Sequence, residues 1–120
     1  MQIIEKRIEE LIEYENNPRH NEAAIDKVAA SIKEFGFKVP IVIDTDNVIV
    51  CGHTRVRAAQ KLGMQTVPCI VADDLSPQQI RAFRLADNKT SEFAEWDFEK
   101  LEQELAELRE LQFDMDDYGF

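Results

Sequence analysis

A run of strand, strand, helix and strand signals in the middle of the chain constrains its fold more than any other feature. PIVID (40–44) and VIVC (48–51) are rich in β-branched residues and predict two strands around a tight polar turn. TRVRAAQKL (54–62) predicts the helix that follows, and QTVPCIVAD (65–73) predicts another strand. Such alternation predicts a small α/β or α+β domain with a mixed sheet.

Helical patterns flank this central run. EAAIDKVAASIKEF (22–35) places apolar residues at helical spacing, and LSPQQIRAFRLADNK (75–89) opens with a capping signal at Ser76. In the strand between, Pro68 indicates a sheet edge or a bulge, because proline cannot donate to a sheet. A short strand at the N-terminus completes the predicted order of strand, helix, strand, strand, helix, strand and two helices.

The last predicted helix, DFEKLEQELAELREL (97–111), has an apolar stripe on an acidic background. We expect two parts in the chain, a sheet-based domain over residues 1–95 and an amphipathic acidic helix with its tail over residues 96–120. The stripe is expected to pack on the same domain. A dimer seam is the alternative, although the helix is short for a coiled coil. The stripe consists of Phe98, Leu101, Leu105, Leu108 and Leu111.

The charge of the chain limits its partners. It carries 24 acids against 14 Lys and Arg, a net charge of −10, and acids dominate its last third. A domain that binds duplex DNA by itself normally has a basic face. We therefore expect DNA contact only through a fused or partner domain.

Cysteine spacing and hydropathy indicate the setting of the chain. Cys51 and Cys69 fit neither a metal motif nor a disulfide framework, and are expected to be small buried side chains. No apolar run approaches the roughly 20 residues that span a bilayer. We expect a cytoplasmic protein that does not enter a membrane.

The junction CGHTR (51–55) is the first candidate site. Where a strand turns through Gly52 into a helix, the first N–H groups of the helix can bind an anion. His53 and Arg55 add donors there, and Arg can grip phosphate with two bonds. Arg57 lies two residues on and is a weaker candidate. A plain helix start with solvated arginines is the alternative.

Two further polar stretches gain meaning beside this junction. NPRH places Arg19 and His20 in a loop, and ADNK places Asp87 and Asn88 at the end of a helix. Asp and Asn oxygens suit Mg²⁺ that is bound to phosphates. The alternatives are an ordinary turn and an ordinary polar helix end.

With these three stretches the chain resembles the ParB/sulfiredoxin superfamily, and within it the ParB-like N-terminal domain. NPRH, CGHTRVRAA and ADNKT occur in the order and rough spacing of the three boxes of that family, over about residues 5–95. The acidic segment that starts at Trp96 and ends at DDYGF is similar to that of ParB-like domains fused to phage or mobile-element DNA methyltransferases. No methyl-transfer motif is present in this chain.

The resemblance implies a regulatory module that binds a nucleoside triphosphate, CTP or ATP, with Mg²⁺. Gly52, His53, Thr54 and Arg55 would surround the triphosphate, with Arg57 as a secondary contact. The remaining roles that the resemblance implies are phosphate contacts from Arg19 and Asn88 and a metal contact from Asp87.

Departures from the family leave two alternatives open. His53 and Thr54 replace the usual Glu-Arg pair of the second box, and Asp87 replaces Glu in the third, which puts CTP specificity and hydrolysis in question. A metal-dependent nuclease or weak NTPase is one alternative, and a protein-interaction domain with a vestigial nucleotide site is the other. Thiol catalysis of the sulfiredoxin kind is disfavoured, because Cys51 precedes the box glycine instead of following it.

Overall fold

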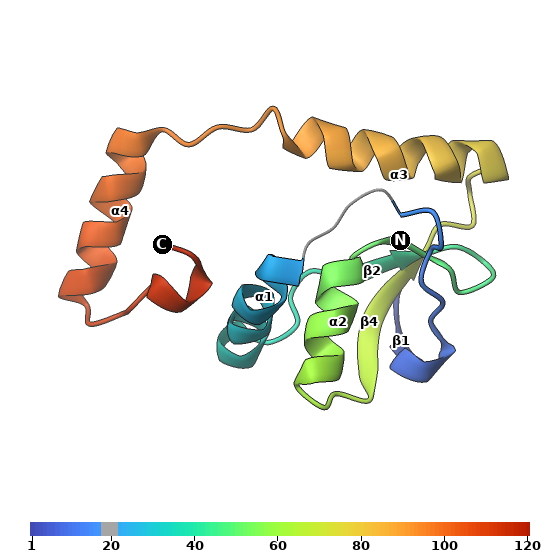
Figure 1. Ribbon diagram of the computed structural model, residues 1–120, viewed down its shortest axis with the longest axis horizontal. Coiled ribbons are helices and arrows are strands. Elements are labelled where there is room, and N and C mark those ends of the chain that lie inside the picture. The colour runs from blue at the N-terminus through green and yellow to red at the C-terminus, as the bar shows by residue number, and fades with distance from the viewer. Residues whose placement is uncertain (18–21) are drawn as a thin grey trace.

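The computed structural model describes residues 1–17 and 22–120 and confirms the predicted mixed α+β architecture (Figure 1). Its elements follow the predicted order, with a 3-10 turn added near each end of the chain. They are β1 (Ile3–Arg7), η1 (Ile8–Glu10), α1 (Glu22–Phe35), β2 (Ile41–Ile43), β3 (Ile49–Cys51), α2 (His53–Lys61), β4 (Thr66–Val71), α3 (Pro77–Ser91), α4 (Phe98–Glu110) and η2 (Asp116–Tyr118).

The four strands form one mixed sheet in the order β1-β4-β2-β3. β1 pairs with β4 and β3 with β2 in antiparallel fashion, whereas β2 and β4 run parallel. The expectation that Pro68 marks a sheet edge or a bulge is wrong, because β4 lies inside the sheet and pairs with β1 in continuous register through Pro68. Pro68 is tolerated there because it faces Glu5 of β1, while pairing with β2 begins only at Cys69.

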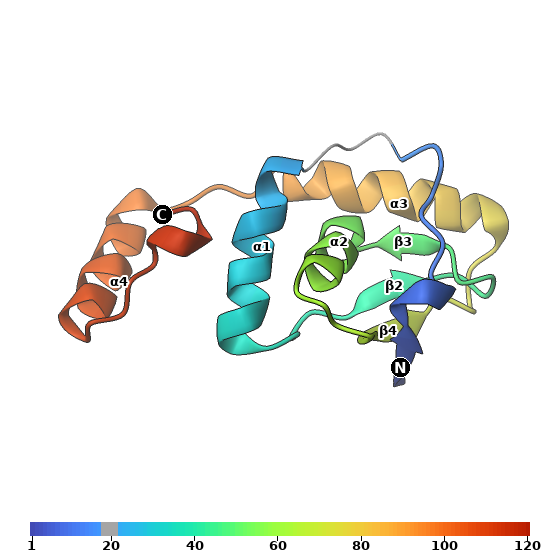
Figure 2. The ribbon, with the colours of Figure 1, turned by 60° about the horizontal axis from the view of Figure 1, so that its bottom comes forward.

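The core lies between this sheet and α2. Ile41, Ile43 and Cys69 from the strands are fully buried, and Val56 and Ala59 of α2 pack in the same cluster. α1 lies against α2 (Figure 2), and Ala29 is its buried residue. The burial follows the sequence periodicity, with alternate residues of β2 and every third or fourth residue of α2 inside.

α3 runs beside β3, the strand at one end of the sheet (Figure 2). The predicted capping box is present: Ser76 Oγ accepts from the Gln79 amide at 3.2 Å, and Gln79 Oε1 accepts from the Ser76 amide at 2.9 Å. Along the 15 residues of α3 only Ile80 and Arg84 are buried. α3 is therefore held to the body of the protein through few side chains.

α4 stands apart from the sheet and its helices (Figure 1). All of its residues are described and none is buried, and Phe98 is 74% exposed. The expectation that its apolar stripe packs on the domain is therefore wrong. The tail makes the contact instead, since the rings of Phe113 and Tyr118 lie 6.0 and 5.3 Å from that of Phe35 at the end of α1.

None of the helices in the described part of the chain combines the length and the apolar character that crossing a bilayer requires.

Candidate functional site

A cavity of about 290 Å³ opens at the N-terminal end of α2. It is bounded by the β3–α2 junction, the first half of α1, the C-terminal third of α3 and the segment that contains Asn17. Most of the site residues predicted from the sequence meet here, although they come from separate segments. The described residues that line it are Asn17, Ala24, Val28, Val50, Cys51, Gly52, His53, Thr54, Arg55, Asp87 and Asn88.

Gly52 allows the chain to turn from β3 into α2. Its φ of 108° lies in the left-handed region, and a Cβ atom there would come within 2.6 Å of Ile41 Cδ1. Its carbonyl accepts the first bond of the helix, from the Val56 amide at 3.0 Å, and it has no side chain to cap the helix. The first turn of α2 therefore begins at the cavity, and Gly52 provides no side-chain acceptor for its amide groups.

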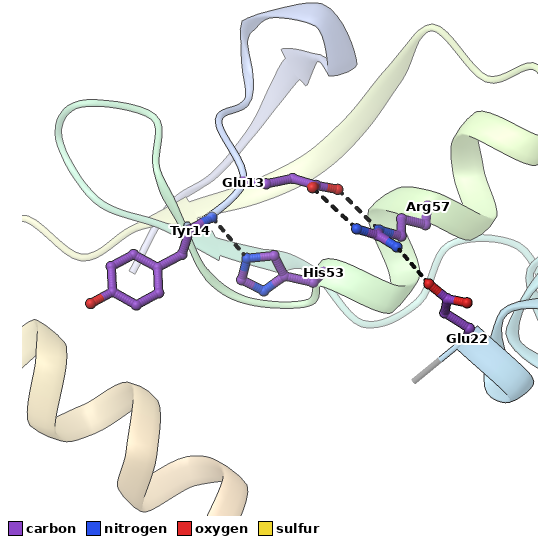
Figure 3. Close-up of polar contacts among 5 residues, drawn as sticks. All are labelled: Glu13, Tyr14, Glu22, His53 and Arg57. Carbon is purple, nitrogen blue, oxygen red and sulfur yellow. Dashed lines mark hydrogen bonds and ion pairs between the residues drawn. The ribbon is translucent and has the colours of Figure 1, made fainter. Parts of the chain in front are cut away.

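His53 is held in one orientation by the segment that precedes α1. Its Nε2 atom accepts a hydrogen bond from the Tyr14 amide at 3.1 Å (Figure 3). Burial lowers the pKa of the imidazole below its usual value, so the neutral ring is favoured at pH 7. A neutral ring that accepts at Nε2 carries its proton on Nδ1, so His53 provides one donor without a charge.

Arg55 lines the cavity and is half-buried. Its Nη1 atom donates to the carbonyls of Val39 and Pro40, at 2.9 and 2.7 Å. Within the described chain its Nε and Nη2 atoms have no such bond, so they remain as donors for a ligand. Burial lowers the pKa of the guanidinium, which nevertheless stays charged at any ordinary pH.

Arg57 points away from the cavity and lines none of it. It forms a two-bond pair with Glu13, from Nε to Oε1 at 3.0 Å and from Nη2 to Oε2 at 3.2 Å, and its Nη1 lies 3.8 Å from Glu22 (Figure 3). Its predicted phosphate contact is therefore replaced by carboxylates. Arg19, the other predicted arginine, lies outside the described residues.

Asp87 and Asn88 of α3 line the cavity together with the β3–α2 junction. Asp87 is the single carboxylate among the described lining residues. No group of three or more His, Cys, Asp or Glu side chains in the described segments could hold a metal ion alone. One carboxylate suits Mg²⁺ only if phosphate oxygens supply further ligands, which is how this ion usually binds.

Cys51 lines the cavity, and its thiol lies close to the Asp87 carboxylate. Burial and the nearby carboxylate raise the pKa of its thiol to about 12. A thiol with this pKa is protonated at pH 7 and is a poor nucleophile. The geometry thus agrees with the sequence-based expectation that Cys51 is not a catalytic cysteine.

Arg84 was missed by sequence reasoning and is 97% buried, with 3% of its surface exposed. Its Nη2 donates to the Ile49 carbonyl at 3.2 Å, and its Cζ lies 3.6 Å from the centre of the Tyr14 ring. Asn88, one turn later, donates to the Arg84 carbonyl at 3.1 Å. Its place in the helix could have indicated that it faces inward, because Arg84 follows the buried Ile80 by one turn and precedes Asn88 by another.

Comparison with known proteins agrees with this geometry. The model of the ParB N-terminal domain family matches residues 1–89. The ParB-like nuclease domain-containing protein YnaK of Escherichia coli is 38% identical over 80 residues, which are 66% of this chain and 92% of YnaK. A probable chromosome-partitioning protein ParB of Campylobacter jejuni is 34% identical over 76 residues, covering 59% of this chain but 27% of that protein.

Solved structures show the same fold at lower identity. ParB from Caulobacter crescentus, complexed with CTP-γ-S, superposes with a TM-score of 0.75 at 24% identity and covers 98% of this chain and 68% of its own. Sulfiredoxin from Arabidopsis thaliana superposes with a TM-score of 0.57 at 22% identity, over 69% of this chain and 97% of its own. Sequence and fold together show that the chain belongs to the ParB N-terminal domain family, whose architecture sulfiredoxin shares.

Proposed function

We propose that this chain is a regulatory module that binds a nucleoside triphosphate with Mg²⁺ at the cavity beside α2. The observation that carries the proposal is the convergence of donors there. The β3–α2 junction supplies Gly52, His53, Thr54 and the guanidinium of Arg55, whose Nε and Nη2 atoms bond to no described residue, in a chain whose net charge is −10. A local gathering of donors within an acidic protein suits a polyanionic ligand.

The division of roles follows from the chemistry of each side chain. The amides of the α2 turn and Arg55 would hold the phosphates, and His53 would donate from Nδ1 without adding charge. Asp87 would bind Mg²⁺ together with phosphate oxygens, and Asn88 would contact the phosphates. The Mg²⁺ ion would add its positive charge to that of Arg55. The solved ParB relative bound to CTP-γ-S supports CTP as the first ligand to test, with ATP as the second.

The test is a thermal-shift panel of CTP, ATP, GTP and UTP with Mg²⁺. Ligand at a hundredfold above Kd stabilises the folded state by about 2.7 kcal/mol, which raises Tm by several degrees. Arg55→Gln should remove the shift, whereas Arg81→Gln, the same charge change on the exposed face of α3, should keep it. The absence of any shift in the wild-type protein would contradict the proposal.

The metal role has a separate test in Asp87→Asn. With Mg²⁺ present, this variant should bind the nucleotide more weakly than wild type, because a metal ligand is lost. With EDTA the order should reverse, because a carboxylate that repels the phosphates is gone. An equal effect under both conditions would argue against metal binding by Asp87.

Metal-dependent cleavage of DNA or hydrolysis of the nucleotide is the second candidate. The observation in its favour is the relation to YnaK, whose name carries a ParB-like nuclease domain. It predicts nicking of plasmid DNA or release of phosphate with Mg²⁺ or Mn²⁺, lost in Asp87→Asn. Binding of nucleotide without DNA cleavage or hydrolysis would argue against this candidate and favour the regulatory role.

The wider setting is part of the same proposal. We place the module in front of a DNA methyltransferase, with DNA contact through that domain, because the chain itself is acidic and the segment from Trp96 resembles that of such fusions. Purification of the native protein with methyltransferase activity would support this. The apolar stripe of α4, none of whose residues is buried, agrees with a homodimer, which sedimentation with and without CTP and Mg²⁺ would detect as a doubled mass.

A further inference from the structure

Arg57 connects three segments that form the walls of the cavity. It belongs to α2, and its two carboxylate partners come from elsewhere, Glu13 from the segment after η1 and Glu22 from the start of α1 (Figure 3). Four positions after Glu13, Asn17 lines the cavity, and two positions after Glu22, Ala24 lines it as well. The guanidinium of Arg57 therefore links three segments that line the cavity: α2, the segment from Glu13 to Asn17, and the start of α1.

The pair is formed at neutral pH and has a defined geometry. The two bonds from Arg57 lower the pKa of the Glu13 carboxyl, and the same bonds raise the pKa of Arg57. Two parallel bonds fix the relative orientation of both groups better than one contact does. The bond from the Tyr14 amide to His53 lies next to Glu13 and holds the same segment to α2 at a second point.

Stability alone does not explain this arrangement. Both side chains are nearly half exposed, at 44% for Arg57 and 48% for Glu13, and exposed ion pairs add little to the free energy of unfolding. The pair acts on the geometry of the cavity instead, because Glu13 belongs to the same short segment as Asn17, which lines the cavity. Segment 13–17 lies between η1 and the residues that precede α1.

We propose that Arg57 is a positioning residue of the nucleotide site: through Glu13 and Glu22 it holds segment 13–17 and the start of α1 against α2. The inference rests on the proposed function, since it describes how the walls of that same site are kept in place. It assigns Arg57 no contact with the ligand.

A simpler role for Arg57 is long-range attraction of phosphate. The two roles predict opposite changes in nucleotide affinity for Glu13→Gln. Removing a carboxylate near an anion site strengthens binding if charge alone matters. Removing the partner of Arg57 weakens binding if positioning matters, by about two- to fivefold for a pair of this exposure. Glu9→Gln is the matched control, because Glu9 forms an exposed pair with Arg7 and does not line the cavity.

The experiment is calorimetric titration of CTP with Mg²⁺ into wild type and the two variants, or of whichever nucleotide the panel identifies. We expect weaker binding by Glu13→Gln, unchanged binding by Glu9→Gln, and similar Tm values for both variants. The exchange of charges in Glu13→Arg with Arg57→Glu should recover affinity relative to either single change, because it restores a pair at the same place.

A second readout does not depend on the ligand. The side-chain amide signal of Asn17 in an NMR spectrum should move in Glu13→Gln and stay in place in Glu9→Gln. If wild type binds nucleotide and Glu13→Gln binds as tightly or more tightly, the positioning role is overturned and the nucleotide site stands. If wild type binds no nucleotide, the proposed function is overturned and the positioning role with it.

Discussion

Replacing Gly52 by alanine tests whether the β3–α2 junction is as tightly fitted as its geometry indicates. The added Cβ would sit at a φ of 108°, which side chains rarely adopt, and 2.6 Å from Cδ1 of Ile41. Ile41 has no exposed surface, so its side chain cannot turn toward solvent to make room. The substitution therefore combines backbone strain with overpacking of the core.

Gly63→Ala is the matched control. Gly63 also has a positive φ, 75°, but a Cβ there would meet nothing within 4 Å. Strain from the left-handed conformation costs roughly 1–2 kcal/mol at either position. Overpacking adds about 1–3 kcal/mol at Gly52 alone. We expect Gly52→Ala to lose that much more of the free energy of unfolding than Gly63→Ala does.

Urea denaturation followed by circular dichroism measures both losses. The slope of the free energy against urea concentration should stay the same in the two variants, so that the midpoints report stability. Equal losses at the two glycines would refute the reasoning, because they would mean that Ile41 moves aside at no cost. Crystals or NMR spectra of the variant would then show a shifted Ile41 side chain.

Three further predictions follow from other groups of the site. Because burial lowers the pKa of His53, the unfolded chain binds more protons than the folded chain just below pH 6.5. The free energy of unfolding should therefore fall as the pH drops through that window. In urea titrations at several pH values, His53→Gln should remove this part of the pH dependence. Arg84→Met should lose about 1–3 kcal/mol, since the Ile49 carbonyl loses its buried donor, while the exposed Arg81→Met stays within about 0.5 kcal/mol; equal values would argue against an anchoring role. With the pKa of its thiol raised to about 12, Cys51 should react with iodoacetamide at pH 8 far more slowly in the native protein than in urea, as mass spectrometry can measure.

The order and type of the elements were predictable because their signals are local. The helical spacing of residues 22–35 and the capping box at Ser76 each depend on side chains a few positions apart, and both appear in the structure. The three polar stretches also predicted most of the cavity, since a strand–glycine–helix junction brings Gly52 and Arg55 to one point.

Contacts between distant segments were not predictable from one sequence. Arg57 and Glu13 are 44 positions apart, and Arg84 and Ile49 are 35 apart, so no periodicity relates them. A basic residue near a phosphate motif suggested a ligand contact for Arg57, but a carboxylate from another segment occupies it. Likewise the stripe of α4 indicated a buried face without indicating what would cover it.

The pairing of β1 with β4 has a consequence for how the protein acquires its shape. Ile3 lies opposite Ile70, so β1 can pair with its partner strand only after all the residues from Ile3 to Ile70 have been synthesised. At about 5–20 residues per second this is a wait of several seconds. Closing so long a loop is slow in refolding as well, because entropy is lost before the contacts form.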